Sequence, residues 1–261
     1  NSIRGAGYLS KLENALVIDV GGTTTDLGVI QNGFPRESSI AVDIGGVRTN
    51  FRMPDVVTIG LGGGSVVRVK EDGSVTVGPD SVGYRITDEA IVFGEDVVTA
   101  TDIAVRLGLY ELGDPTRAAV IDETVARKAF DRIRELIEDA LDAIKTSGSE
   151  MDVILVGGGS IILPEKLSGA KSVAKPKYFG TANALGSAIS KVSGTYEKLV
   201  DYDKLPREEA LAKAKDEAAE MAVKAGAMRE TVEIVDVEDV PLAYYPGNTS
   251  RVKIKAAGEL G

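Results

Sequence analysis

The sequence predicts an α/β protein in which a mixed sheet is flanked by helices, with a β-rich insertion and a C-terminal α+β appendage. Two apolar strands enclose a Gly-Thr turn in "VIDVGGTTTDLGVI" (Val17–Ile30), which indicates a hairpin near the start of the chain. A long amphipathic helix is predicted over Ile121–Lys145, and a buried-type strand follows it at Val153–Val156. Strands that lead into helix, strand and helix are typical of this fold class.

The first half of the chain is expected to be rich in short strands. Three are predicted at Leu16–Val20, Leu27–Ile30 and Ser38–Asp43, with an Asn-Gly hairpin turn within Gln31–Pro35. A glycine-rich β insertion follows at about residues 45–98, and "KEDGS" at Lys70–Ser74 indicates a second hairpin. A short helix is then predicted over Thr99–Gly108, where Thr99 and Asp102 form a capping signal.

The second half is expected to contain helices and a separate C-terminal part. A small-residue helix is predicted over Gly180–Val192. The elements after it are an Ala-rich helix, two strands and the turn between them, at Arg207–Met228, Thr231–Val240, Ser250–Ala256 and Tyr244–Asn248. We expect residues 1–194 to form one domain that includes the insertion, with residues 195–261 packed on it.

Composition removes several classes of function. The 261 residues contain no Cys and no His, which excludes disulfides, thiolate chemistry, Ser-His-Asp catalysis and most zinc sites. The net charge of -10 repels nucleic acid and anionic membranes, so neither is an expected partner. The apolar runs are too short to span a bilayer and nothing resembles a signal peptide, so we expect a cytoplasmic protein.

The Gly-Thr turn carries the pattern of a phosphate site. Amide N–H groups, glycines and hydroxyls suit a polyphosphate, and the expected contacts are Gly21, Gly22, Thr23 and Thr24. The carboxylates of Asp19 and Asp26 would repel phosphate unless Mg²⁺ lies between them. We therefore predict Asp19 and Asp26 as metal ligands and catalytic residues of phosphoryl transfer, where either could hold the hydrated cation or orient the attacking water. A plain hairpin built from turn-forming residues is the alternative.

A second glycine turn follows the strand at Val153–Val156. In "VILVGGGSIILP" the bare backbone of Gly157, Gly158, Gly159 and Ser160 would let the flat part of a nucleoside lie against it. A strand-to-helix turn that needs positive φ explains the same glycines without a ligand.

Together these motifs resemble the second half of an actin-like ATPase, whose core is a ribonuclease H-like mixed sheet. "VIDVGGTTTDLGVI" is similar to the second phosphate loop, "ILVGGGSIILP" to the adenosine loop and "ANALGSAIS" to the second connecting helix. The resemblance places Asp19 and Asp26 on the acidic pair and implies ATP and Mg²⁺ as cofactors. It also implies that residues 1–194 are an ATPase half-domain.

Within that superfamily, several segments of the sequence resemble those of the hydantoinase A / 5-oxoprolinase family. "NSIRGAGYLS", "VRTNFRMPDVVTIGLGGGS", "GPDSVGYRITDEAIVFG" and "VEDVPLAYYPGN" all read like its segments. Members cleave cyclic amides with ATP, so the resemblance implies that the γ-phosphoryl group activates a ring carbonyl oxygen. It also implies a B-type partner subunit, and a homo-oligomer is compatible with it.

One departure from the family concerns the first phosphate loop, of "DxGGTxTD" type, which precedes "NSIRGAG" in relatives. This chain has one such loop, so a missing N-terminal half is expected to supply the other wall of the cleft. A nucleotide-binding switch or assembly module, as in actin or chaperones, remains the alternative to an enzyme. The glycine-rich insertion favours the enzyme, because a switch has no need of it.

Weaker candidates concern the substrate. Arg48 and Arg52 would clamp a carboxylate by bidentate hydrogen bonds, although such arginines more often form surface ion pairs. Gly62, Gly63 and Gly64 in "GLGGGS" form a further turn that would face the substrate, with a simple bend between strands as the alternative. The ring substrate itself is left open among hydantoins, 5-oxoproline and ketones.

Overall fold

The computed structural model describes residues 1–37, 42–44, 47–49, 54–146, 148–243, 245 and 247–261. The chain divides into two compact units, Asn1–Ala188 and Ile189–Gly261. The boundary expected at residues 194–195 lies inside a strand of the second unit, β11 (Val192–Asp201).

A mixed six-stranded sheet forms the centre of the first unit. Its strands are β1 (Ala15–Val20), β2 (Thr25–Gln31), β3 (Phe34–Pro35), β6 (Val56–Ile59), β9 (Met151–Val156) and β10 (Ala170–Ala174). The order is β10-β9-β1-β2-β3, and β6 pairs with β2 beside β3. Strand β1 is antiparallel to β2 and parallel to β9, so the ends of β1 and β9 meet at one edge.

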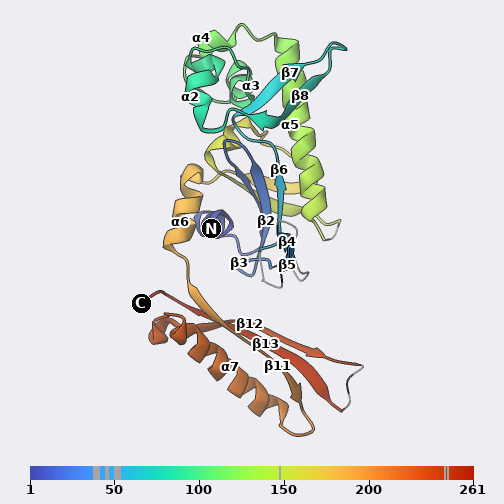
Figure 1. The fold of residues 1–261 in the computed structure, drawn as a ribbon, viewed down its shortest axis with the longest axis vertical. Helices are drawn as coiled ribbons and strands as arrows, with labels where there is room; N and C mark the ends of the chain where they lie inside the picture. Colours follow the sequence, from blue (N-terminus) through green and yellow to red (C-terminus); the bar gives the residue numbers. More distant parts are fainter. Residues whose placement is uncertain (38–41, 45–46, 50–53, 147, 244, 246) are drawn as a thin grey trace. The chain divides into compact units, whose positions relative to one another are not determined.

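Helices cover both faces of this sheet, as Figure 1 shows for α5 and α6. Because side chains alternate along a strand, Leu16 and Ile18 of β1 pack with α3 (Ala100–Arg106) and α5 (Glu123–Ile144) in the largest core cluster. Ala15 and Val17 point to the other face, where α1 (Ser2–Ser10) and α6 (Ala182–Ala188) lie. Both faces are therefore buried, which explains the nearly continuous apolar sequence of β1.

Helix α1 was not predicted, because two glycines lower its intrinsic helix propensity. Packing against α6 supplies the reason for one of them, Gly5, and for Gly186 of α6. A Cβ on Gly5 would overlap the carbonyl oxygen of Ala182, and a Cβ on Gly186 would lie 3.0 Å from the nitrogen of Gly5. The two helices can approach this closely only with glycine at their crossing.

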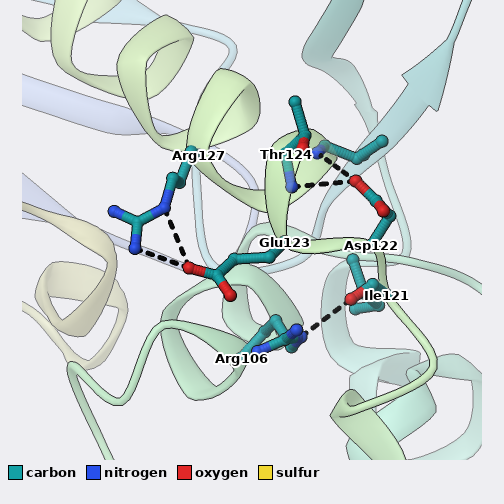
Figure 2. A network of polar contacts seen from close by, with 7 residues as sticks. Arg106, Ile121, Asp122, Glu123, Thr124 and Arg127 are labelled. Atoms are coloured by element: carbon teal, nitrogen blue, oxygen red, sulfur yellow. Dashed lines mark hydrogen bonds and ion pairs between the residues drawn. The ribbon is translucent and has the colours of Figure 1, made fainter.

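A polar network joins the end of α3 to the start of α5 (Figure 2). Arg106 Nε donates to the carbonyl oxygen of Ile121 at 2.7 Å. Asp122 caps α5 by accepting from the N–H groups of Thr124 and Val125 at 2.8 and 3.1 Å. These backbone N–H groups stabilise the carboxylate and lower the pKa of Asp122. The cap fixes where the long helix begins.

The remaining elements of the first unit are short. Two hairpins, β4–β5 and β7–β8, are formed by Val42–Ile44 with Val47–Thr49 and by Ser65–Val69 with Val75–Ser81. The other helical turns are η1 (Gly83–Arg85), α2 (Ile86–Glu89), η2 (Ile91–Phe93), α4 (Pro115–Ala118), η3 (Gly158–Ile162) and η4 (Phe179–Thr181).

The second unit is a three-stranded antiparallel sheet covered by one helix. Its order is β11-β13-β12, with α7 (Arg207–Lys224), η5 (Arg229–Thr231), β12 (Glu233–Pro241) and β13 (Thr249–Gly258). The buried residues of α7 are all alanines spaced by four: Ala210, Ala214, Ala218 and Ala222. Small side chains let the helix lie close to the sheet, where Gly194 of β11 would place a Cβ 2.6 Å from the carbonyl oxygen of Ala218.

Most element predictions are confirmed, and two differ from the structure in part. The Asn-Gly hairpin is present, with positive φ at Asn32 and Gly33. Of Ser38–Asp43, residues 38–41 lie outside the described residues, and Val42–Asp43 pairs with β5 rather than with the central sheet. The small-residue helix stops at Ala188, not Val192, because Val192 already belongs to β11. Strand β11 itself was missed.

Candidate functional site

The two carboxylates of the Gly-Thr hairpin lie side by side. Asp19 of β1 and Asp26 of β2 are register partners, and Asp26 is in turn the partner of Thr58 in β6. Register partners project from the same face of a sheet, so the three side chains form a row at the edge where β1 ends. Thr58 Oγ1 donates to Asp26 Oδ1 at 2.6 Å. Asp19 is half-buried and Asp26 exposed, so both reach one open surface.

The turn between these strands is exposed at Gly22, Thr23 and Thr24. It is closed by a hydrogen bond from the N–H of Gly21 to the carbonyl oxygen of Thr24 at 2.9 Å. Thr25 differs from its neighbours because it is fully buried, and its Oγ1 donates to the carbonyl oxygen of Leu61 at 2.6 Å. Only two of the three consecutive hydroxyl groups therefore face outward.

The Gly62–Gly64 turn packs directly behind the Gly21–Thr24 turn. The N–H of Gly63 donates to the carbonyl oxygen of Gly21 at 2.9 Å, and that of Gly64 to the carbonyl oxygen of Gly22 at 2.7 Å. A Cβ on Gly62 would lie 2.6 Å from both the carbonyl carbon of Gly22 and the nitrogen of Thr23. This contact requires glycine, and it makes Gly62–Gly64 a support for the exposed turn.

These two hydrogen bonds determine where the amides of the exposed turn point. In a trans peptide unit the C=O and N–H groups point in opposite directions, and the one cis bond in the described residues is Gly78-Pro79. Because the carbonyls of Gly21 and Gly22 face the support, the N–H groups of Gly22 and Thr23 face away from it. Within the described part of the chain, no protein oxygen accepts from either N–H. Two adjacent free donors of this kind suit an anion.

Ser81, at the end of β8, holds the exposed turn from a further side. Its Oγ donates to the carbonyl oxygen of Gly22 at 3.2 Å and accepts from the N–H of Gly83 at 3.0 Å. Gly83 has a positive φ of 57°, and a Cβ there would lie 3.4 Å from Thr23 Oγ1. The insertion therefore fixes the turn through backbone and hydroxyl groups.

The Gly157–Gly159 turn meets the same structure at the edge of the sheet. A Cβ on Gly157 would overlap Asp19 Oδ1, and a Cβ on Gly159 would overlap the carbonyl oxygen of Gly21. Gly158 is exposed, with no atom within 4 Å of a Cβ position. The two glycine turns thus lie against each other, with Asp19 between them and open space above Gly158.

Ser160 and Lys175 lie at the far end of that turn. Ser160 is fully buried, and its Oγ has no hydrogen-bond partner among the residues that the structure describes; the predicted contact of this hydroxyl with a ligand stays a prediction. Lys175 Nζ donates to the carbonyl oxygen of Ser160 at 3.0 Å and lies 5.1 Å from the centre of the Phe179 ring. Burial around the ammonium group lowers the pKa of Lys175, while the charge of Glu165 opposes that shift.

The weaker substrate candidates have different outcomes. Arg52 lies outside the described residues, and Arg48 lies in β5 away from the central sheet's pairing. Gly62, Gly63 and Gly64 are buried, so their burial assigns them the supporting role above, and a direct contact with substrate stays a prediction. The predicted capping signal at the start of α3 is confirmed: Thr99 is the N-cap, and the carboxylate of Asp102 accepts from the N–H and Oγ1 of Thr99, each at 2.7 Å.

The pair of carboxylates fits a hydrated magnesium ion better than an all-protein metal site. Across the described residues, no three acidic side chains are arranged to hold a metal ion. Mg²⁺ usually takes one or two carboxylates and completes its shell with water and phosphate oxygens. Asp19 and Asp26 offer such a pair. Sequence patterns pointed to both, but not to Thr58, which reaches Asp26 through the pairing of β6 with β2, nor to Ser81, which reaches Gly22 from the end of β8.

None of the helices in the described residues combines the length and the apolar character needed to cross a bilayer.

Comparison with known sequences identifies relatives. The profile of the Hydantoinase/oxoprolinase family matches residues 1–144. Caprolactamase subunit alpha of Pseudomonas jessenii is 26% identical over 196 residues, which are 72% of this chain and 26% of that protein. The acetone carboxylase beta subunit of Xanthobacter autotrophicus is 30% identical over 143 residues, 52% of this chain and 19% of that protein.

Comparison with solved structures shows the same fold over nearly the whole chain. The crystal structure of ATP-dependent caprolactamase from Pseudomonas jessenii has a TM-score of 0.70 at 17% identity and covers 98% of this chain and 48% of that one. The structure of nucleotide-free acetone carboxylase has a TM-score of 0.61 at 16% identity, and the match covers 100% of this chain and 48% of that one. The predicted actin-like ATPase fold is confirmed. This chain spans less than half the length of these proteins.

Proposed function

Because the chain belongs to the hydantoinase/oxoprolinase family, we propose that it is the nucleotide-binding part of an ATP-dependent enzyme that opens cyclic amides. In this reaction the γ-phosphoryl group of ATP is transferred to the carbonyl oxygen of the ring. The carbon that bears the phosphorylated oxygen is then open to attack by water. The C–N bond of the adduct breaks, the ring nitrogen leaves as an amine, and the opened chain carries an acyl phosphate. A second water hydrolyses the acyl phosphate to a carboxylate and free phosphate.

The observation that carries the proposal is the outward direction of the N–H groups of Gly22 and Thr23. Two free amides next to exposed hydroxyls form a cradle for phosphate oxygens. The neighbouring carboxylates of Asp19 and Asp26 make such a cradle useful only when a cation is present. A polyphosphate bound with Mg²⁺ satisfies both groups, whereas a simple anion satisfies only one.

Each part of the site has a distinct role in the proposal. The Gly21–Thr24 turn binds the phosphates, and Asp19 and Asp26 hold the hydrated magnesium ion, which neutralises phosphate charge when bound. The open backbone at Gly158 accommodates the nucleoside. Thr58 keeps Asp26 oriented through its hydrogen bond. Protein groups here position and neutralise, which is the main requirement of phosphoryl transfer.

The rest of the enzyme lies outside this chain in the proposal. Similar proteins are named as subunits and are more than twice as long as this chain in their solved structures. We therefore propose that a second phosphate-binding half completes the cleft and that a B-type subunit takes part in ring opening. Turnover is accordingly expected from the complete gene product together with its partner subunit.

The test is a coupled measurement of ATP hydrolysis and ring opening. The complete gene product and its partner would be incubated with Mg-ATP and, in turn, 5-oxoproline, hydantoin and caprolactam. Release of phosphate in step with ring opening of one of them is the expected result. Nucleotide-dependent assembly without turnover of any cyclic amide or ketone would instead support a switch or assembly module.

A further inference from the structure

Thr101, on helix α3, contacts the support behind the phosphate-binding turn. It is 2% exposed, and both its N–H and its Oγ1 donate to the carbonyl oxygen of Gly63, each at 2.9 Å. A Cβ on Gly63 would lie 3.0 Å from Thr101 Oγ1, so this hydroxyl fits closely against the glycine. The support is therefore held at its carbonyl by one residue of α3.

Gly63 passes this constraint on to the exposed turn. Its carbonyl shares one rigid peptide unit with the N–H of Gly64, and that N–H donates to the carbonyl oxygen of Gly22 at 2.7 Å. The direction of the Gly22 carbonyl in turn sets the direction of the next N–H, that of Thr23, because these two groups also belong to one peptide unit. The hydroxyl of Thr101 is thus two hydrogen bonds away from an amide proposed to bind phosphate.

Helix α3 is itself firmly placed, which makes Thr101 a fixed reference. Asp102 Oδ2 accepts from the N–H and Oγ1 of Thr99, and its Oδ1 accepts from the N–H of Val92 at 2.8 Å. All of these groups except the Val92 backbone belong to the first turn of the helix. A flexible helix could not orient another turn. Helix α3 can, because both carboxylate oxygens of Asp102 accept hydrogen bonds that fix its first turn.

We propose that Thr101 is a positioning residue for phosphate binding, acting through the peptide unit of Gly63 and Gly64 on the amide of Thr23. The proposal rests on the function proposed above. Because the N–H of Thr101 already satisfies the Gly63 carbonyl, the fold does not need the hydroxyl. The second hydrogen bond fixes the direction in which the carbonyl points.

Two substitutions separate the hydroxyl from packing. Thr101→Val keeps the volume and removes the hydroxyl, and Thr101→Ser keeps the hydroxyl and removes a methyl group. The Kd of the complete gene product for Mg-ATP should rise about five- to tenfold in Thr101→Val, as expected for losing one oriented hydrogen bond. In Thr101→Ser it should stay within about twofold.

Adenosine carries no phosphate, so its binding distinguishes a positioning role from a purely structural one. A purely structural role of Thr101 would weaken the binding of adenosine and of Mg-ATP alike. The Kd for adenosine should change less than about twofold in Thr101→Val, because the Gly157–Gly159 turn does not depend on this hydroxyl. Thr231→Val in the second unit is the matched control. It removes a hydroxyl that donates to the carbonyl of Met228 at 2.8 Å and should leave both Kd values unchanged.

Three results would overturn the inference: unchanged Mg-ATP binding in Thr101→Val, a larger loss in Thr101→Ser than in Thr101→Val, or equal losses for ATP and adenosine. If the wild-type protein fails to bind Mg-ATP, the proposed function fails and this inference with it. Wild-type binding together with unaffected Thr101→Val refutes the inference alone.

Discussion

The Gly21–Thr24 turn and the Gly62–Gly64 turn lie back to back and use their N–H groups in opposite ways. In the first, the N–H groups of Gly22 and Thr23 face outward without a protein acceptor among the described residues. In the second, the N–H groups of Gly63 and Gly64 donate hydrogen bonds to the carbonyl oxygens of the first turn. One turn is exposed and the other buried, although their sequences are similarly rich in glycine.

This difference shows that glycine content alone does not identify a ligand-binding turn. Glycine permits close approach of any group, whether a phosphate or another stretch of backbone. The two turns differ in the direction of their N–H groups. Each N–H points opposite to the carbonyl of the preceding residue, because both belong to one peptide unit.

The carboxylate beside the outward-facing turn should have the largest effect. Asp19→Asn should lower the kcat of Mg-ATP hydrolysis by about 100-fold or more, because the metal loses a charged ligand. The amide keeps the shape of the side chain, so the circular dichroism spectrum and thermal midpoint should stay close to wild type.

Asp216→Asn, on the exposed side of α7, is the matched control and should retain full activity. Full activity in Asp19→Asn would remove Asp19 from the site.

The same substitution in the two turns should have contrasting effects. Gly62→Ala places a methyl group 2.6 Å from backbone atoms of Gly22 and Thr23 and should destabilise the protein by about 1–3 kcal/mol. In Gly22→Ala the nearest atom to the new methyl group is 3.9 Å away, so stability should hardly change. Urea denaturation measures both. Equal destabilisation would mean that the two turns do not differ in packing.

The Gly157–Gly159 turn contains a contrast of the same kind. Gly158→Val adds a side chain in open space and should weaken nucleotide binding more than it weakens folding. Gly159→Val would overlap the carbonyl oxygen of Gly21 and should lower the thermal midpoint clearly. Nucleotide titration and thermal denaturation of both variants make the comparison. Unfolding of Gly158→Val would instead support a purely structural role for that turn.

The smallest effect is expected at the cap of α5, which belongs to neither turn. The pKa of Asp122 is lowered in the folded state, so its stabilisation is present above the ordinary pKa of 3.8 and is lost as pH falls through the lowered folded value. The thermal midpoint of Asp122→Ala should therefore lie below that of wild type at pH 7, and the difference should shrink in acid.

Asp122→Asn keeps a capping oxygen without a titrating charge and should lose most of that pH dependence. If the difference in thermal midpoint between wild type and Asp122→Ala grew as the pH fell, the predicted direction of the pH dependence would be wrong.

Local patterns in the sequence predicted much of this structure. The hairpin that makes Asp19 and Asp26 partners, the strand before Gly157 and the Thr99–Asp102 cap all follow from neighbouring residues. The support of the exposed turn does not, because it depends on β6 pairing with β2 from the insertion. The same pairing brings Thr58 to Asp26, and no pattern in the surrounding segment "VVTIG" predicts this contact.

Missed or shortened elements have a similar cause. Helix α1 is stabilised by its packing on the central sheet and on α6, whereas its glycines lower its intrinsic helix propensity, so the sequence pattern did not predict it. Strand β11 follows a small-residue segment whose composition suited a longer helix, yet pairing with β13 along Val192–Asp201 decides its conformation. In each case a tertiary contact outweighs a local preference.

The direction of the amides is the central claim, and an amide-resolved NMR titration of the chain with Mg-ADP tests it most directly. The account predicts that the signals of Gly22 and Thr23 shift as the nucleotide is added. The amides of Gly63 and Gly64 should be protected from solvent exchange before any nucleotide is present. Unshifted signals at Gly22 and Thr23, or rapid exchange at Gly63 and Gly64 in the free protein, would contradict it.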